Sequence, residues 1–212
     1  MRIHGLLWFL AFLVSLLLSP LAVTPEHFRG LINEELGQTS ARYGAREGLT
    51  ISRRGEAIYD AMVARTGIEA GLTATAVPSA PSNDLIIATV ERAGHVRQLE
   101  RVVMGYVPGL LQSLYLFCLR FSHSWHWLIW LAPFLAALAF DGVMTRRAKL
   151  QSFQYTHPTV YNLSWHLIIA VFAASMLAYS LALTLPLTFY PFALVSEGVL
   201  LRLLLSNIQH SA

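Results

Sequence analysis

Phe140-Asp-Gly-Val-Met-Thr-Arg-Arg-Ala-Lys149 predicts both a membrane location and an orientation for this chain. It follows a run from Trp125 to Phe140 that contains no Asp, Glu, Lys or Arg. Three cations, Arg146, Arg147 and Lys149, then fall within four residues. An apolar run closed by clustered Arg and Lys is how a membrane crossing ends on the cytoplasmic side. We therefore expect a transmembrane helix here whose basic end lies in the cytoplasm.

The composition agrees with a membrane protein. Of the 212 residues, 55% are hydrophobic and only 13% are charged, whereas soluble domains carry about 25% charged residues. The charges concentrate in residues 24–101, which hold nine Arg and ten acids, while residues 102–212 hold five Arg or Lys and two acids. Because acids match the bases in the polar segment, no basic patch is apparent and we expect no direct binding of nucleic acid. Cys118 is the only cysteine, which excludes an intrachain disulfide.

Residues 1–23 predict an N-terminal membrane anchor. Arg2 precedes an apolar run from Gly5 to Val23, which is longer than the h-region of a cleavable signal peptide. Nineteen residues of helix would measure about 28 Å, enough to cross the hydrocarbon core. We expect the segment to remain uncleaved, with Arg2 in the cytoplasm.

The polar segment that follows, residues 24–101, predicts helices and loops on the periplasmic side. Thr24-Pro25-Glu26 has the pattern of a helix start, and Gly37 is expected to end that helix. A second helix is expected from Gly55 to Arg65, and residues 71–83, rich in Thr, Ala, Pro and Ser, predict a loop. The apolar content is low, so we do not expect this segment to fold alone.

Apolar residues at helical spacing predict one long helix from about residue 96 to 143. Such a helix would be about 70 Å long, roughly twice the bilayer core, so part of it must lie outside the core. Arg2 and the basic cluster both favour the cytoplasm, so the number of crossings between them must be even. We therefore expect residues 102–124 to form a projecting or interfacial segment, packed on partners, and Trp125–Val143 to cross. The stripe comprises Val96, Leu99, Val103, Tyr106, Leu110, Leu114, Phe117 and Phe121.

Residues 125–212 predict a three-helix membrane region with a basic cytoplasmic turn at 144–160. After Trp125–Val143, the expected crossings are Leu163–Leu185 and Phe192–Ile208, the second of which could instead be an interfacial helix. The predicted fold is thus an all-α integral membrane protein of about four transmembrane helices, with both termini in the cytoplasm.

Three short elements give this chain a family resemblance. They are Asp141-Gly-Val-Met-Thr-Arg-Arg147, Pro158-Thr-Val-Tyr161 with His166 beyond it, and Leu185-Pro-Leu-Thr-Phe-Tyr-Pro191. In these elements the chain resembles the integrating conjugative element membrane proteins, which carry a domain of unknown function. The motif positions are Asp141, Gly142, Pro158, Tyr161, His166, Pro186 and Pro191.

The resemblance implies a place in conjugative DNA transfer. Genes of that family lie among type IV secretion genes, near the coupling ATPase. The resemblance therefore implies a scaffolding subunit of the bacterial inner membrane, without enzymatic activity, whose partners are the lipid bilayer and other membrane subunits. The coupling ATPase is the first expected partner, Arg146, Arg147 and Lys149 form its candidate docking site, and self-association is an alternative use of the apolar stripe.

The sequence gives less support to a metal, haem or proton-transfer site. His123 and His126 have the spacing of a shared metal or haem face, but a third ligand would have to come from His4, His157 or His166, which the topology places at the opposite face. Asp141 is expected to pair with the cations that follow it rather than to carry protons. We expect no cofactor and no metal, and keep a small transporter or channel subunit, or a haem or metal enzyme, as alternatives.

Overall fold

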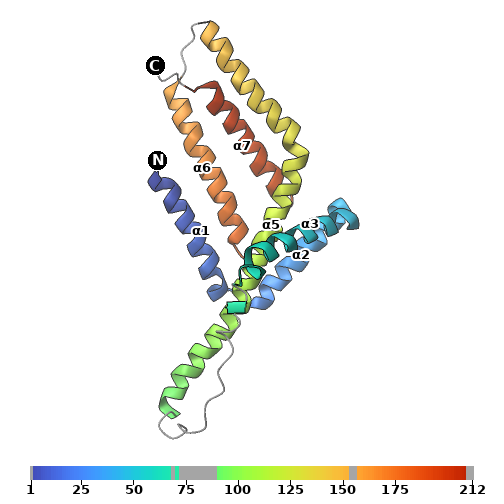
Figure 1. The fold of residues 1–212 in the computed structure, drawn as a ribbon, viewed down its shortest axis with the longest axis vertical. Coiled ribbons are helices and arrows are strands. Elements are labelled where there is room, and N and C mark those ends of the chain that lie inside the picture. The colour runs from blue at the N-terminus through green and yellow to red at the C-terminus, as the bar shows by residue number, and fades with distance from the viewer. Residues whose placement is uncertain (1, 68–69, 72–89, 153–156, 209–212) are drawn as a thin grey trace. The chain divides into compact units, whose positions relative to one another are not determined.

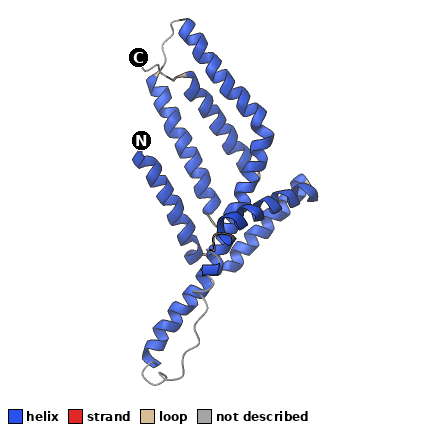
Figure 2. Ribbon diagram, viewed as in Figure 1, coloured by secondary structure: helices blue, strands red, loops and turns tan. Residues whose placement is uncertain are grey.

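The computed structural model describes residues 2–67, 70–71, 90–152 and 157–208, without the side chains of residues 2–4, 64 and 90–105. Every regular element in these ranges is a helix (Figures 1 and 2). The helices are α1 (Arg2–Ala22), α2 (Pro25–Tyr43), α3 (Ala45–Tyr59), the short π-helix η1 (Asp60–Ala64), α5 (Val90–Gln151), α6 (Pro158–Ser180) and α7 (Phe189–Ser206).

Four of these helices are long and apolar enough to cross a membrane. The qualifying segments within the described residues are Gly5–Ala22, Tyr106–Gln151, Pro158–Ser180 and Phe189–Ser206. The predicted all-α fold with four candidate spans is therefore confirmed. Helix α5 has 62 residues, which corresponds to about 93 Å and exceeds the bilayer core about threefold.

The chain divides into two compact units. Unit 1 comprises residues 1–12, 121–179 and 185–212, and unit 2 comprises residues 13–120 and 180–184. The division of α5 falls between Arg120 and Phe121, close to the point at which the sequence predicts that the crossing segment begins.

In unit 2, helices α2 and α3 form a pair whose boundaries differ from the prediction. Helix α2 begins at Pro25 as expected, but it continues past Gly37 and ends at Tyr43. The actual stop is Gly44, whose φ of 88° lies in the left-handed region that glycine adopts readily. Helix α3 then begins at Ala45, ten residues before the predicted start at Gly55. A glycine with helical neighbours is a weak stop signal, and both glycines lie within helices here.

The helices of the polar segment pack on α5. Phe28, Leu31 and Leu116 form a buried cluster, against which Val23, Ile32 and Ala182 also pack. A Cβ at Gly55 would lie 3.2 Å from the Cα of Leu119, so the backbones of α3 and α5 approach closely there. The thin apolar face of α2 is therefore completed by side chains of the membrane-type helix.

Packing within unit 2 also covers part of the apolar surface that α5 presents. Leu110 is buried as expected, but the most deeply buried leucines are Leu116 and Leu119, which lie outside the predicted stripe. Phe121 belongs to unit 1 and is 37% exposed. The side chains of Val96, Leu99 and Val103 lie outside the described residues. Within unit 2, part of the apolar surface that was expected to need another protein is covered by this chain itself.

In unit 1, α7 lies between α6 and residues 121–151 of α5 (Figure 1). Glycines allow close contact between α5 and α7: a Cβ at Gly142 would lie 2.8 Å from the carbonyl oxygen of Arg202, and one at Gly198 would lie 2.5 Å from Leu135 Cδ2. Small residues at helix contacts are the usual device for packing helices within membranes. Large apolar side chains such as Trp130 and Phe192 are exposed, as lipid-facing residues are.

The region expected to be a basic turn begins as helix. Helix α5 continues through Arg146, Arg147 and Lys149 to Gln151, and α6 begins at Pro158. Residues 153–156 lie outside the described part of the chain, as does most of the loop predicted at 71–83. Asp141 and Gly142 accordingly lie within α5 and do not mark its end.

Candidate functional sites

Arg120 is the centre of a buried polar cluster in unit 2. Its side chain is fully buried and forms an ion pair with Glu35 of α2, with 2.6 Å between Nη2 and Oε1. Nε also donates to Oε1 at 3.0 Å, so two guanidinium nitrogens bind one carboxylate. Nη1 donates to the carbonyl oxygen of Leu181 at 2.7 Å, and Nη2 donates to that of Leu183. We call these four residues the Arg120 cluster.

The cluster joins three segments that lie far apart in the sequence. Glu35 and Arg120 are separated by 85 residues, and Arg120 and Leu183 by 63. Arg suits this role because its planar fork of donors can bind a carboxylate and two carbonyls at once. A buried ion pair adds little net stability over an apolar replacement, but removing one partner leaves an uncompensated charge that costs about 3–5 kcal/mol.

Sequence reasoning missed this cluster, although one signal was present. Arg120 is the single Lys, Arg, Asp or Glu between Arg101 and Asp141. A lone charge within a membrane-type apolar helix ordinarily faces protein and has a partner. The partner itself could not be inferred, since Glu35 is one of many acids in the polar segment.

Asp141 pairs with a different cation from the one expected. Its carboxylate accepts a hydrogen bond from Nε of Arg202 on α7, and the two side chains are 51% and 41% exposed. The predicted pairing with Arg146 and Arg147 is therefore wrong. Because α5 continues as helix, those cations lie five and six residues beyond Asp141, whereas helix neighbours lie three or four residues apart. Asp141 and Gly142 together form the contact of α5 with Arg202.

The three cations of the basic cluster on α5, Arg146, Arg147 and Lys149, have different surroundings. Nζ of Lys149 donates to the backbone carbonyl of Ser206 at 3.2 Å and to Oδ1 of Asn207 at 3.1 Å. It thus satisfies a carbonyl at the C-terminus of α7, where a cation also complements the helix dipole. Arg147 is exposed, and Nε of Arg146 is buried without a hydrogen-bond partner. Arg147 is therefore the most accessible of the three cations.

The family-motif positions mostly shape helix ends. Pro158 is the first residue of α6, and Pro191 lies in the first turn of α7, where backbone N–H groups have no partner within the helix. The carbonyl oxygen of Pro186 accepts from the backbone N–H of Phe189 at 2.9 Å. Tyr161 lies in the first two turns of α6 and is half-buried, whereas His166 lies in the third turn and is exposed. The three prolines thus lie where the last two helices begin.

His123 and His126 have aromatic neighbours in unit 1. The buried ring of His123 stacks on Tyr190, with 5.1 Å between centroids, while His126 lies near Trp127 and Trp130. Within the residues that the structure describes, no group of three or more His, Cys, Asp or Glu side chains could hold a metal ion. The side chain of His4, one proposed third ligand, lies outside those residues.

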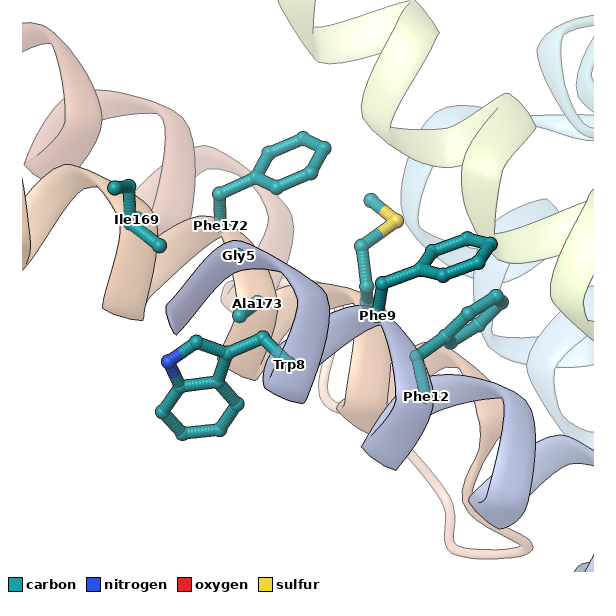
Figure 3. A pocket seen from close by; sticks show the side chains of 8 residues that line it. Gly5, Trp8, Phe9, Phe12, Ile169, Phe172 and Ala173 are labelled. Atoms are coloured by element: carbon teal, nitrogen blue, oxygen red, sulfur yellow. The ribbon is translucent and has the colours of Figure 1, made fainter. Parts of the chain in front are cut away.

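Unit 1 also contains two apolar pockets of about 240 Å³ each. In the first, Trp8, Phe9 and Phe12 of α1 meet Ile169 and Phe172 of α6 (Figure 3). The second lies among α5, α6 and α7 and differs from the first in one respect, because the carboxylate-bearing Glu197 lines it. Both are candidate binding sites, and only the second offers a charged group.

Comparison with known protein families gives one finding. Residues 23–211 match a family described as IncC plasmid conjugative DNA transfer protein DtrJ-like. The expected relation to a conjugation-associated family is therefore confirmed. No curated protein and no solved structure matches the chain.

Proposed function

This chain belongs to the DtrJ-like family of conjugative DNA-transfer proteins, and from that premise we propose that it is a structural subunit of a DNA-transfer apparatus in the bacterial inner membrane. The observation that carries the proposal is the Arg120 cluster, which fixes the polar helix α2 to the membrane-type helix α5. A polar helical segment held in this way is suited to presenting a fixed surface to other proteins. We infer a scaffolding role without catalysis.

The proposed topology has four crossings, with both termini in the cytoplasm and residues 24–101 in the periplasm. Its support is the distribution of cations, with Arg2 at one end and Arg146, Arg147 and Lys149 after the second span. A periplasm-active reporter fused after Ala80 or Leu187 should be active, and one fused after Leu150 should be inactive. An active fusion at Leu150 would overturn this topology.

The first proposed partner is the coupling ATPase of a type IV secretion system, bound at the cytoplasmic basic cluster. Arg147 is the residue to test, because Lys149 is engaged at the end of α7. Arg147→Glu should weaken co-purification of the ATPase from detergent-solubilised membranes, while Arg42→Glu on α2 serves as a charge-matched control. Equal recovery with both variants would exclude this docking site, and recovery of the chain alone would favour self-association.

A clean deletion tests the proposed function itself. Deleting the gene should reduce transfer of the mobile element to recipients without slowing host growth, and expression from another locus should restore transfer. Donors that carry either an integrating conjugative element or a conjugative plasmid would show which element the protein serves. Unimpaired transfer in the deletion strain would contradict a role in conjugation.

A transporter or channel subunit is the second candidate, and Glu197 is the observation that favours it. This carboxylate lines a pocket among three candidate spans, and ionisable groups within spans mark transport pathways in many membrane proteins. Proton or cation flux across liposomes containing the purified protein, abolished by Glu197→Gln, would support this candidate. Absence of flux would leave the structural role.

A further inference from the structure

Glu197 lies deep within its candidate span. It is eight residues beyond Phe189, where α7 begins, and nine before Ser206, where α7 ends. At 1.5 Å per residue, each end of the helix is about 12 Å away or more. A charged group at that depth is costly, and such residues ordinarily face protein and have a partner.

Glu197 differs from Asp141, which is the other acid within the candidate spans. Glu35 is paired with Arg120, and Asp141 is paired with Arg202. In the part of the chain that the structure describes, the Glu197 carboxylate makes no hydrogen bond or ion pair. It is half-buried and lines the pocket among α5, α6 and α7.

The polar groups of that pocket do not supply a cation. The hydroxyl groups of Ser124 and Tyr179 hydrogen-bond to each other, and Ser175 donates to the carbonyl oxygen of Val171. The remaining lining is apolar or aromatic and includes Phe121 and Trp125. The pocket therefore combines an apolar wall, a free volume of about 240 Å³ and one carboxylate without a counter-charge.

We propose that this pocket binds a transmembrane helix of a different membrane protein, which places a Lys or Arg side chain against Glu197. The inference rests on the proposed function, because the partner is then another subunit of the transfer apparatus. A lipid ammonium group lies at the membrane surface, about 12 Å from the depth of Glu197. An interhelical ion pair at mid-membrane depth satisfies the carboxylate and fixes the register of the partner helix.

A second copy of this chain is a poorer occupant. Residues 5–22 and 158–180 contain no Lys or Arg, and the only one in α7 is Arg202, which is paired with Asp141. Arg120 of α5 is fully buried in its own cluster. Arg146, Arg147 and Lys149 lie in the last two turns of α5, at the end of its span and not at the depth of Glu197. The candidate spans of a second copy therefore offer no free cation at the required depth, and a different protein has to supply it.

Site-specific photo-cross-linking in mating-competent cells tests the proposal. A photoreactive residue at Leu194, which lines the pocket, should cross-link to one membrane protein that has a Lys or Arg within a span. The same residue at Val199, exposed on the same helix and not part of the pocket lining, is the matched control. Glu197→Gln should reduce the Leu194 product about tenfold or more, because removing one partner of a buried charge pair weakens association by at least that factor.

A charge exchange makes the test specific. Glu197→Asp should retain the cross-link, Glu197→Lys should abolish it, and replacement of the partner's Lys or Arg by Glu should restore it to the Glu197→Lys variant. A cross-link that is unchanged in Glu197→Gln, one confined to lipid or to the chain itself, or none at all would overturn the proposal. Loss of transfer on deletion together with normal cross-linking in Glu197→Gln would overturn this inference alone and leave the proposed function intact.

Discussion

Two ion pairs in the described part of the chain differ in their surroundings. In unit 2, Glu35 and Arg120 are 2% and 0% exposed, and the guanidinium also binds two backbone carbonyls. In unit 1, Arg202 and Asp141 are 41% and 51% exposed, and the pair lies where α5 and α7 already touch through Gly142. Arg202 is four residues from the end of α7, so its side chain can extend to the water-facing edge of the membrane.

The difference in exposure implies that the buried and the exposed ion pair contribute to the fold in different ways. A buried pair constrains which segments come together, because any other arrangement leaves a charge without a partner. An exposed pair contributes about 1 kcal/mol or less, since solvent screens it and side-chain entropy opposes it. We therefore expect unit 2 to depend on its ion pair and the α5–α7 contact of unit 1 to depend on its glycines.

The largest effect is expected from breaking the buried pair. Arg120→Met or Glu35→Met alone should destabilise unit 2 by about 3–5 kcal/mol, because each leaves one buried charge uncompensated. The measurement is the rate of tryptic cleavage within α2 and α3 in detergent, which should rise. Glu34→Met, at the exposed neighbouring position on α2, should leave the cleavage rate unchanged, and an equal increase in all three variants would contradict a specific role for the pair.

A smaller effect is expected from filling the glycine contact of unit 1. Gly142→Leu should destabilise the contact between α5 and α7 by about 1–3 kcal/mol, the usual cost of overpacking. The physical reason is that even a Cβ would lie 2.8 Å from the carbonyl oxygen of Arg202. Thermal unfolding in detergent, followed by circular dichroism, should show a lower midpoint. Gly37→Ala, at a helical glycine with nothing within 4 Å of an added Cβ, should not lower it, and a Gly142→Leu variant as stable as the parent would refute the close contact.

The smallest effect is expected from the exposed pair. Asp141→Asn should cost about 1 kcal/mol or less, because half-exposed ion pairs contribute little. Membrane accumulation should fall modestly, and the reporter after Leu150 should stay inactive because acids contribute little to topology.

Replacing Arg146, Arg147 and Lys149 together by Asn should instead scramble the orientation of the protein in the membrane. If Asp141→Asn inverted the protein and the triple variant did not, the assignment of topology to the cations would fail.

Local signals in the sequence predicted the helices, but they could not predict the ion pairs between residues that lie far apart in the sequence. Apolar length predicted the existence of α1, α6 and α7, although α6 begins and ends five residues before the expected Leu163 and Leu185. Thr24-Pro25 predicted the start of α2. The boundary between α2 and α3 was missed because it depends on the positive φ of Gly44. Glu35 and Arg120 are 85 residues apart, and Asp141 and Arg202 are 61 apart. No helical spacing connects such residues, so their pairing follows only from the tertiary packing.

Double-mutant cycles on these two ion pairs, with unfolding in detergent as the readout, test the central claim that the buried residues Glu35 and Arg120 each require the other. Each cycle compares two single Met variants with the double Met variant of the same pair. For Glu35 and Arg120 we expect a coupling energy of about 2–3 kcal/mol or more, with the double variant more stable than either single variant. For Asp141 and Arg202 we expect about 1 kcal/mol or less. A coupling energy near zero for Glu35 and Arg120, or a larger one for Asp141 and Arg202, would contradict the account.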